Sequence, residues 1–302
     1  MTHCDNQALT KSLKCLAGEH QLPPSYTDNA LAFYPRVIDW LLAVLDRHEG
    51  STYVLGIYGA QGTGKTTFAE LLSRYLTDRH DKAVANLSID DFYYSRAERQ
   101  QLAADVNPLL ATRGPPGTHD VDLALATIRR LTALAPGESI RIPRFDKATD
   151  DRAPASAWPT VAGPVDLVIL EGWCIGCTPS TPAALAEPLN ALERNQDRDG
   201  SWRRFVNEAI GEYQPLFALL CGVVMLKAPS LAAATDWRHE QESKLRQSGR
   251  AAADRAMTPS EIDRFLQLFE RVSRRTEAEM EDRADVICHL GADHLIKAVT
   301  LR

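Results

Sequence analysis

The feature that most constrains this sequence is the run GAQGTGKT at residues 59–66. It fits the pattern G-x-x-x-x-G-K-[ST] at every fixed position. The apolar run YVLGIY precedes it, and a helical pattern begins near Lys65. Glycines let a backbone wrap closely around phosphate oxygens, and the N-terminus of a helix favours negative charge. The sequence therefore predicts a strand, a phosphate-binding loop and a helix in that order.

The residues of this loop have predicted roles in nucleotide binding. Lys65 is expected to be a mobile cation for the β- and γ-phosphates of ATP, and the Thr66 hydroxyl is expected to ligate Mg²⁺. The predicted nucleotide-binding set is Gly59, Ala60, Gln61, Gly62, Thr63, Gly64, Lys65, Thr66 and Thr67.

Carboxylates follow two other predicted strands. Asp90 and Asp91 end the strand expected over residues 83–89, and Glu171 ends the buried run VDLVIL. Ligands of doubly wound sheets bind at the carboxyl ends of strands, so all three acids should lie near the loop. We expect Asp90 to orient or deprotonate the attacking hydroxyl, and Thr66, Asp90 and Glu171 to serve the metal. Asp91 is the alternative metal ligand, and the sequence does not separate the two aspartates.

Strands alternate with helices along the chain. Further strands are expected at residues 222–226 and 286–290, and helices at 30–48, 121–134, 202–219 and 231–247. This order predicts an α/β fold, a P-loop NTPase with three α/β/α layers, a mostly parallel sheet and a helical lid. Residues 1–30 are expected to be a loosely packed arm. Residues 31–302 are expected to be a single kinase domain, with an irregular substrate-facing segment over 95–119 and the lid at about 231–258.

Composition narrows the class of protein. The 34 basic and 40 acidic residues give a net charge of −6, which argues against nucleic-acid or anionic-membrane binding. No apolar run approaches the roughly 20 residues that span a bilayer. Six cysteines in a chain of 302 residues do not form a dense disulfide framework, so we expect reduced thiols and a cytoplasmic protein. Cys174 and Cys177 form a single C-x-x-C, interpreted as packing rather than a zinc or redox site.

Four further strings carry a family resemblance: SIDDFY (88–93), RGPPGTHD (113–120), IPRFDKATDDR (142–152) and LEGW (170–173). From about Val54 onward the chain resembles the P-loop D-glycerate 3-kinases, which are related to uridine kinase, phosphoribulokinase and bacterial pantothenate kinase. The resemblance implies ATP, Mg²⁺ and transfer of the γ-phosphoryl group to a primary hydroxyl of D-glycerate. It also implies that Asp90 is the catalytic base, that Glu171 is the acid of the third motif, and that His119 and Asp120 help to contact the acceptor.

An acceptor with a carboxylate needs cationic or backbone donors, because a buried carboxylate without partners is costly. Arg144 in PRFDK is the strongest single candidate, and Arg152 lies in the same basic cluster. The alternatives are a nucleoside or pantothenate kinase, which would favour fewer arginines, and a regulatory NTPase, although the guanine-reading string N-K-x-D does not occur. The predicted acceptor-binding set is Asp91, Tyr93, Arg113, His119, Asp120, Arg144 and Lys147.

The predicted lid helix carries two arginines with a catalytic role in this interpretation. Arg238 and Arg246 are eight residues apart, about two helical turns, so they lie on roughly the same side. A lid arginine neutralises charge on the phosphoryl group in transfer, and a closed lid excludes water.

Overall fold

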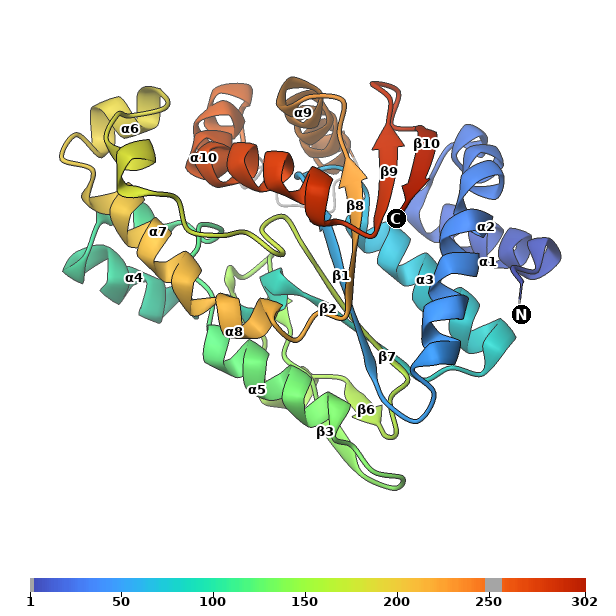
Figure 1. Ribbon diagram of the computed structural model, residues 1–302. Helices are drawn as coiled ribbons and strands as arrows, with labels where there is room; N and C mark the ends of the chain where they lie inside the picture. Colours follow the sequence, from blue (N-terminus) through green and yellow to red (C-terminus); the bar gives the residue numbers. More distant parts are fainter. Residues whose placement is uncertain (1–2, 248–256) are drawn as a thin grey trace.

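The structure is a computed structural model that describes residues 3–247 and 257–302, apart from the side chains of residues 244–247. Its main sheet has six strands (Figure 1). β10 pairs antiparallel with β9, whereas the other neighbouring strands pair in parallel. In spatial order the strands are β10 (Ile296–Leu301), β9 (Val286–Leu290), β8 (Gly222–Lys227), β1 (Tyr53–Gly59), β7 (Leu167–Gly172) and β2 (Val84–Ser88).

Helices cover both faces of this sheet. The side chains of β1 alternate between two apolar clusters, one on each face. Leu55 and Ile57 pack with α1 (Asn6–His20), α2 (Pro24–Arg47) and α3 (Lys65–His80). Val54 and Tyr58 belong to the cluster on the other face. That cluster includes residues of α5 (Val121–Thr132), α7 (Ser201–Glu212), α8 (Gln214–Phe217) and α10 (Pro259–Arg283). The predicted three-layer α/β/α fold is confirmed (Figure 1).

Shorter elements lie outside the main sheet, and they include two two-stranded sheets. α4 (Arg96–Asp105) lies inside the segment that was expected to be irregular, because Ser95 and Glu98 form a capping box that starts it. The helix expected over 202–219 is instead α7 followed by α8, which has a proline in its first turn. The remaining short elements are β3 (Ser139–Arg141), β4 (Phe145–Asp146), β5 (Asp151–Arg152), β6 (Thr160–Ala162) and α6 (Ala191–Gln196). β3 pairs with β6, and β4 pairs with β5.

The expectation of a loosely packed arm over residues 1–30 is wrong for the described part. α1 is a helix capped by Asp5, and Leu9, Leu13 and Leu16 on one of its faces are fully buried. These leucines recur at helical spacing and pack with α2 and α3. α2 begins at Pro24, in the first turn, where proline is tolerated. The boundary between an arm and a kinase domain stays a prediction.

The predicted lid begins with α9 (Leu231–Gln247), which follows β8. Residues 248–256 and the side chain of Arg246 lie outside what the structure describes. Thr258 and Glu261 form the predicted capping box and start α10. Across the described ranges, no helix is long and apolar enough to span a membrane.

Candidate active site

The phosphate-binding loop joins β1 to α3 as the sequence predicts. Gly62 and Gly64 have φ values of 82° and 85°, in the left-handed region that favours glycine. A Cβ at Gly59 would come within 2.6 Å of the Thr63 hydroxyl, and one at Gly62 would lie 3.1 Å from the Cβ of Trp237. The loop therefore has its shape because glycines occupy its tightest positions.

Lys65 and Thr66 sit in the first turn of α3, beside Glu171 at the end of β7. The Lys65 ammonium donates to the Ala60 carbonyl at 3.0 Å, which folds the side chain back over the loop. The Thr66 hydroxyl donates to the Glu171 carboxylate at 2.9 Å. Burial lowers the pKa of Lys65 and raises that of Glu171, while their opposite charges partly offset both shifts. Thr66 and Glu171, two members of the predicted metal-binding set, are thus in direct contact.

Asp90 and Asp91 lie in a 3₁₀ turn (Ile89–Phe92) directly after β2, and their surroundings differ. Asp90 accepts from the Tyr93 hydroxyl at 2.8 Å and from the Lys147 ammonium at 2.7 Å. Burial alone would raise the pKa of Asp90, but Lys147, His119 and Tyr93 together outweigh it and lower the pKa to about 2. Asp91 accepts from the backbone N–H of Ser88 at 3.0 Å and closes the turn as a capping box. The structure thus distinguishes the two aspartates.

Asp90, Asp91 and Glu171 line one cavity of about 240 Å³ at the carboxyl edge of the sheet. Arg144 reaches it and forms an ion pair with Asp91 at 3.2 Å. Burial raises the pKa of Asp91, and Arg144 only partly offsets that shift. The polar residues that line this cavity include Thr66, Asp90, Asp91, Arg144, Lys147 and Glu171.

Other residues predicted to contact the acceptor already have protein partners. Arg113 forms an ion pair with Asp150. Asp120 caps α5 by accepting from the N–H of Leu123, and it pairs with Arg152 at 3.1 Å. These contacts tie the segment over residues 113–120 to the hairpin that carries Lys147.

His119 is buried behind the cavity rather than on its surface, with 1% of the residue exposed. Its ring stacks on that of Tyr93, with 4.4 Å between centroids and 23° between planes. Burial lowers the pKa of His119 to about 4, so the ring is neutral at neutral pH. Tyr93 and His119 thus form a layer directly behind Asp90.

α9, the predicted lid helix, lies against the phosphate loop. Trp237 of α9 stacks on His294 with 3.9 Å between centroids, and His294 Nε2 lies 2.5 Å from the Gly62 carbonyl oxygen. Arg238 pairs with Glu242 within α9 at 2.7 Å. His294 follows the last predicted strand, and no sequence motif marks it.

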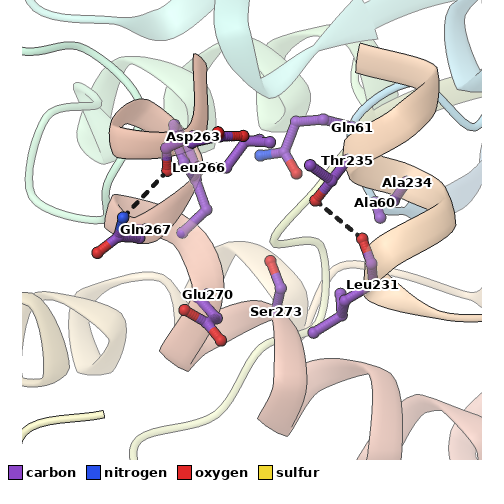
Figure 2. Close-up of a pocket in the computed structure, with 11 residues that line it drawn as sticks. Ala60, Gln61, Leu231, Ala234, Thr235, Asp263, Leu266, Gln267, Glu270 and Ser273 are labelled. Atoms are coloured by element: carbon purple, nitrogen blue, oxygen red, sulfur yellow. Dashed lines mark hydrogen bonds between the residues drawn. The ribbon is translucent and has the colours of Figure 1, made fainter. Parts of the chain in front are cut away.

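A second cavity of about 240 Å³ opens on the other side of the loop, between α9 and α10. Figure 2 shows Gln61 entering it from the loop, with Thr235 on one helix and Asp263 on the other. The Gln61 side-chain nitrogen is buried without a hydrogen-bond partner in the described part of the chain. The loop thus lies between two cavities.

Cys174 and Cys177 are fully buried in the apolar cluster that also contains Trp173. Both are free thiols. Their neighbourhood raises the pKa of Cys174 well above its usual value, chiefly through its hydrogen bond to Cys177 and through burial. Since thiolates carry cysteine reactivity, this environment supports the packing interpretation.

Comparisons with known proteins bear on this site. Residues 54–177 match the phosphoribulokinase / uridine kinase family. The chain is 34% identical over 241 residues to the uncharacterized kinase mug58 of Schizosaccharomyces pombe, a match that covers 76% of this chain and 84% of that protein. It is 31% identical over 229 residues to the chloroplastic D-glycerate 3-kinase of Arabidopsis thaliana, covering 72% of this chain and 46% of that protein.

A solved structure agrees with the fold. The D-glycerate 3-kinase of Cryptococcus neoformans aligns with a TM-score of 0.74 and 23% sequence identity. The alignment covers 88% of this chain and 98% of the other. At that identity the likeness supports the α/β/α architecture alone.

Proposed function

Because the chain belongs to the phosphoribulokinase and uridine kinase family of P-loop kinases, we propose that it transfers the γ-phosphoryl group of ATP to a hydroxyl of D-glycerate, forming 3-phosphoglycerate. The 31% identity to the chloroplastic D-glycerate 3-kinase of Arabidopsis thaliana supports this acceptor. The observation that carries the proposal is the cavity where Thr66 of the phosphate loop meets Asp90, Arg144 and Lys147. This cavity places a carboxylate that can take a proton, Asp90, and two cations that can bind a substrate carboxylate, Arg144 and Lys147, next to the phosphate loop.

The donor end of the reaction depends on the loop and on Lys65. Backbone N–H groups of the loop and the N-terminus of α3 would bind phosphate oxygens. Lys65 donates to the Ala60 carbonyl in the structure. A phosphate oxygen is a charged and therefore stronger hydrogen-bond partner than this neutral carbonyl, so it can replace the carbonyl when ATP binds. Lys65 would then hold the terminal phosphates in line with the acceptor.

Mg²⁺ fits the oxygen groups at this edge. Thr66 and Glu171 are already within 2.9 Å of each other, and Asp90 lines the same cavity. Mg²⁺ is commonly held by one or two carboxylates together with waters and phosphate oxygens, so these few oxygen groups are enough to bind it. When bound, Mg²⁺ neutralises charge on the β- and γ-phosphates.

Asp90 would receive the acceptor hydroxyl. Tyr93 donates to one of its oxygens and Lys147 to the other, so the carboxylate is held in one orientation. A carboxylate with a pKa of about 2 is a weak base, and it acts here mainly by orienting the hydroxyl and accepting its proton late, as charge develops. Lys147, whose side chain is 61% exposed, and Arg144 would bind the carboxylate of the acceptor.

The test is an ADP-release assay coupled to NADH oxidation, run with purified protein and four acceptors: D-glycerate, uridine, pantothenate and ribulose 5-phosphate. We expect the highest kcat/KM with D-glycerate. A clear preference for another acceptor would refute the substrate and leave the kinase intact. ADP release that does not depend on any acceptor, together with a stable nucleotide-bound partner complex, would favour a regulatory NTPase.

A pair of variants separates anion binding from general damage. Arg144→Ala should raise the KM for D-glycerate by about tenfold or more, because a charge-assisted contact is worth about 1.5–3 kcal/mol. Arg141→Ala, at an exposed arginine of β3, is the matched control and should leave the KM unchanged. Equal effects in both variants would remove the support for an anionic acceptor at this cavity.

A further inference from the structure

A backbone bridge holds His119 behind the proposed catalytic aspartate. Tyr93 and His119 form an isolated antiparallel bridge, and the N–H of Asp120 donates to the Phe92 carbonyl at 2.7 Å beside it. The two rings therefore stack in a fixed register. Since the Tyr93 hydroxyl donates to Asp90, the stack ends on the carboxylate that faces the cavity.

Tyr213 contacts this stack from a distant part of the chain. It lies at the junction of α7 and α8, is fully buried, and places its hydroxyl 2.7 Å from His119 Nδ1. The same oxygen accepts from the N–H of Gly117 at 3.3 Å. The rings of Tyr213 and His119 meet edge to face, with 5.8 Å between centroids. No motif and no comparison assigns a role to this tyrosine.

The number of protons on His119 and on the Tyr213 hydroxyl favours one tautomer of His119. A neutral imidazole carries one N–H, and a tyrosine hydroxyl has one proton to donate. If Tyr213 donates to Nδ1, the proton of His119 lies on Nε2, and that N–H has no partner among the described residues. If Nδ1 were protonated instead, it would donate to the Tyr213 oxygen, and the Tyr213 hydroxyl proton would lack an acceptor while unprotonated Nε2 lacked a donor. The first arrangement leaves one buried polar group unsatisfied rather than two, so it is favoured.

We propose that Tyr213 is a positioning residue: it holds His119 as the neutral Nε2–H tautomer, and this ring fixes Tyr93 and thereby the orientation of the Asp90 carboxylate. The inference rests on the proposed function of Asp90. Its chain of contacts is Tyr213 to His119 at 2.7 Å, His119 to Tyr93 by stacking, and Tyr93 to Asp90 at 2.8 Å.

Neutral His119 also keeps a second positive charge away from Asp90. Lys147 already pairs with that carboxylate at 2.7 Å. A protonated His119 beside it would make Asp90 a still weaker acceptor for the proton of the substrate hydroxyl. A Tyr213 hydroxyl that donates to Nδ1 stabilises the unprotonated nitrogen and therefore opposes this charge.

The tautomer is tested directly by ¹⁵N NMR of histidine-labelled full-length protein, with the His119 signals assigned by their loss in His119→Gln. We expect an N–H-type shift for Nε2 and an unprotonated-type shift for Nδ1 at neutral pH. An N–H-type shift for Nδ1 would overturn the proposal. This readout needs no turnover, so it is independent of whether D-glycerate is the acceptor.

The kinetic test uses Tyr213→Phe, which removes only the hydroxyl. We expect kcat to fall by about tenfold, since misplacing a reacting group by a fraction of an ångström is costly, with the KM for ATP unchanged. Tyr75→Phe is the matched control. Tyr75 is also fully buried, but it belongs to the apolar cluster on the opposite face of the sheet, and its hydroxyl accepts from the N–H of Asp5. A kcat in Tyr213→Phe equal to that of Tyr75→Phe, measured on the acceptor with the highest kcat/KM, would also overturn the proposal.

Discussion

At the scale of single residues, the two adjacent aspartates should separate by their effects. Asp90 faces the cavity with both oxygens engaged by side chains, whereas Asp91 holds the backbone of the turn. Asp90→Asn should lower kcat by about 10²–10⁴, the usual contribution of a group that handles a proton. Asp91→Asn should chiefly lower the free energy of unfolding, by about 1–3 kcal/mol, as a charged cap and an ion pair are lost. Steady-state kinetics and urea unfolding measure the two effects.

The paired design decides between the aspartates. A fall in kcat as large for Asp91→Asn as for Asp90→Asn would contradict the assignment. An Asp90→Asn protein that loses stability but keeps its kcat would contradict it as well.

A second prediction at this scale concerns His119 and pH. Its pKa is about 4 in the folded protein and about 6.5 unfolded, so below pH 6.5 the unfolded state binds more protons. This residue's contribution to stability is therefore lost as pH falls from about 6.5 toward 4. From the two pKa values, the loss between pH 7 and pH 5 is about 2 kcal/mol. Urea unfolding measures the free energy of unfolding at both pH values. Between pH 7 and pH 5, His119→Gln should lose about 2 kcal/mol less of it than the unchanged protein does. Equal losses in the two proteins would contradict this prediction.

At the scale of the element, α1 tests the correction to the predicted arm. Leu13 is fully buried against α2 and α3, whereas its neighbour Lys14 is exposed. Leu13→Ala should lower the free energy of unfolding by about 2–5 kcal/mol through lost burial and a cavity. Lys14→Ala should change it by less than about 0.5 kcal/mol. Similar values for both variants, measured by denaturant unfolding, would mean that α1 does not belong to the core.

The elements also show what sequence reasoning can reach. The buried strands β1, β7 and β8 were predicted because apolar runs between turn signals mark strands covered on both faces. α1 was missed because Pro23 and Pro24 and the polar composition hid its stripe of leucines. β10, an edge strand with only two buried positions, gave too weak a pattern. Contacts such as Lys147 with Asp90, or Tyr213 with His119, depend on the paths of long loops, which no local pattern encodes.

At the scale of the whole molecule, nucleotide binding should couple to stability through Lys65. A ligand that binds only the folded state at 100 times its Kd raises the free energy of unfolding by about 2.7 kcal/mol. We expect ATP with Mg²⁺ to stabilise the protein in this way, as measured by thermal unfolding. Lys65→Ala should lose most of the effect because a cation for the phosphates is gone. Lys14→Ala should keep it, and a Lys65→Ala protein with a full shift would contradict the proposed phosphate loop.

In the proposed reaction the cavity beside the phosphate loop directs a phosphoryl group onto an acceptor hydroxyl rather than onto water. ³¹P NMR of a reaction with ATP, Mg²⁺ and D-glycerate tests it most directly, because the products of the two outcomes differ. We expect a phosphomonoester on the C3 hydroxyl of glycerate, formed in equal amount to ADP. Inorganic phosphate as the sole new phosphorus product beside ADP would contradict it.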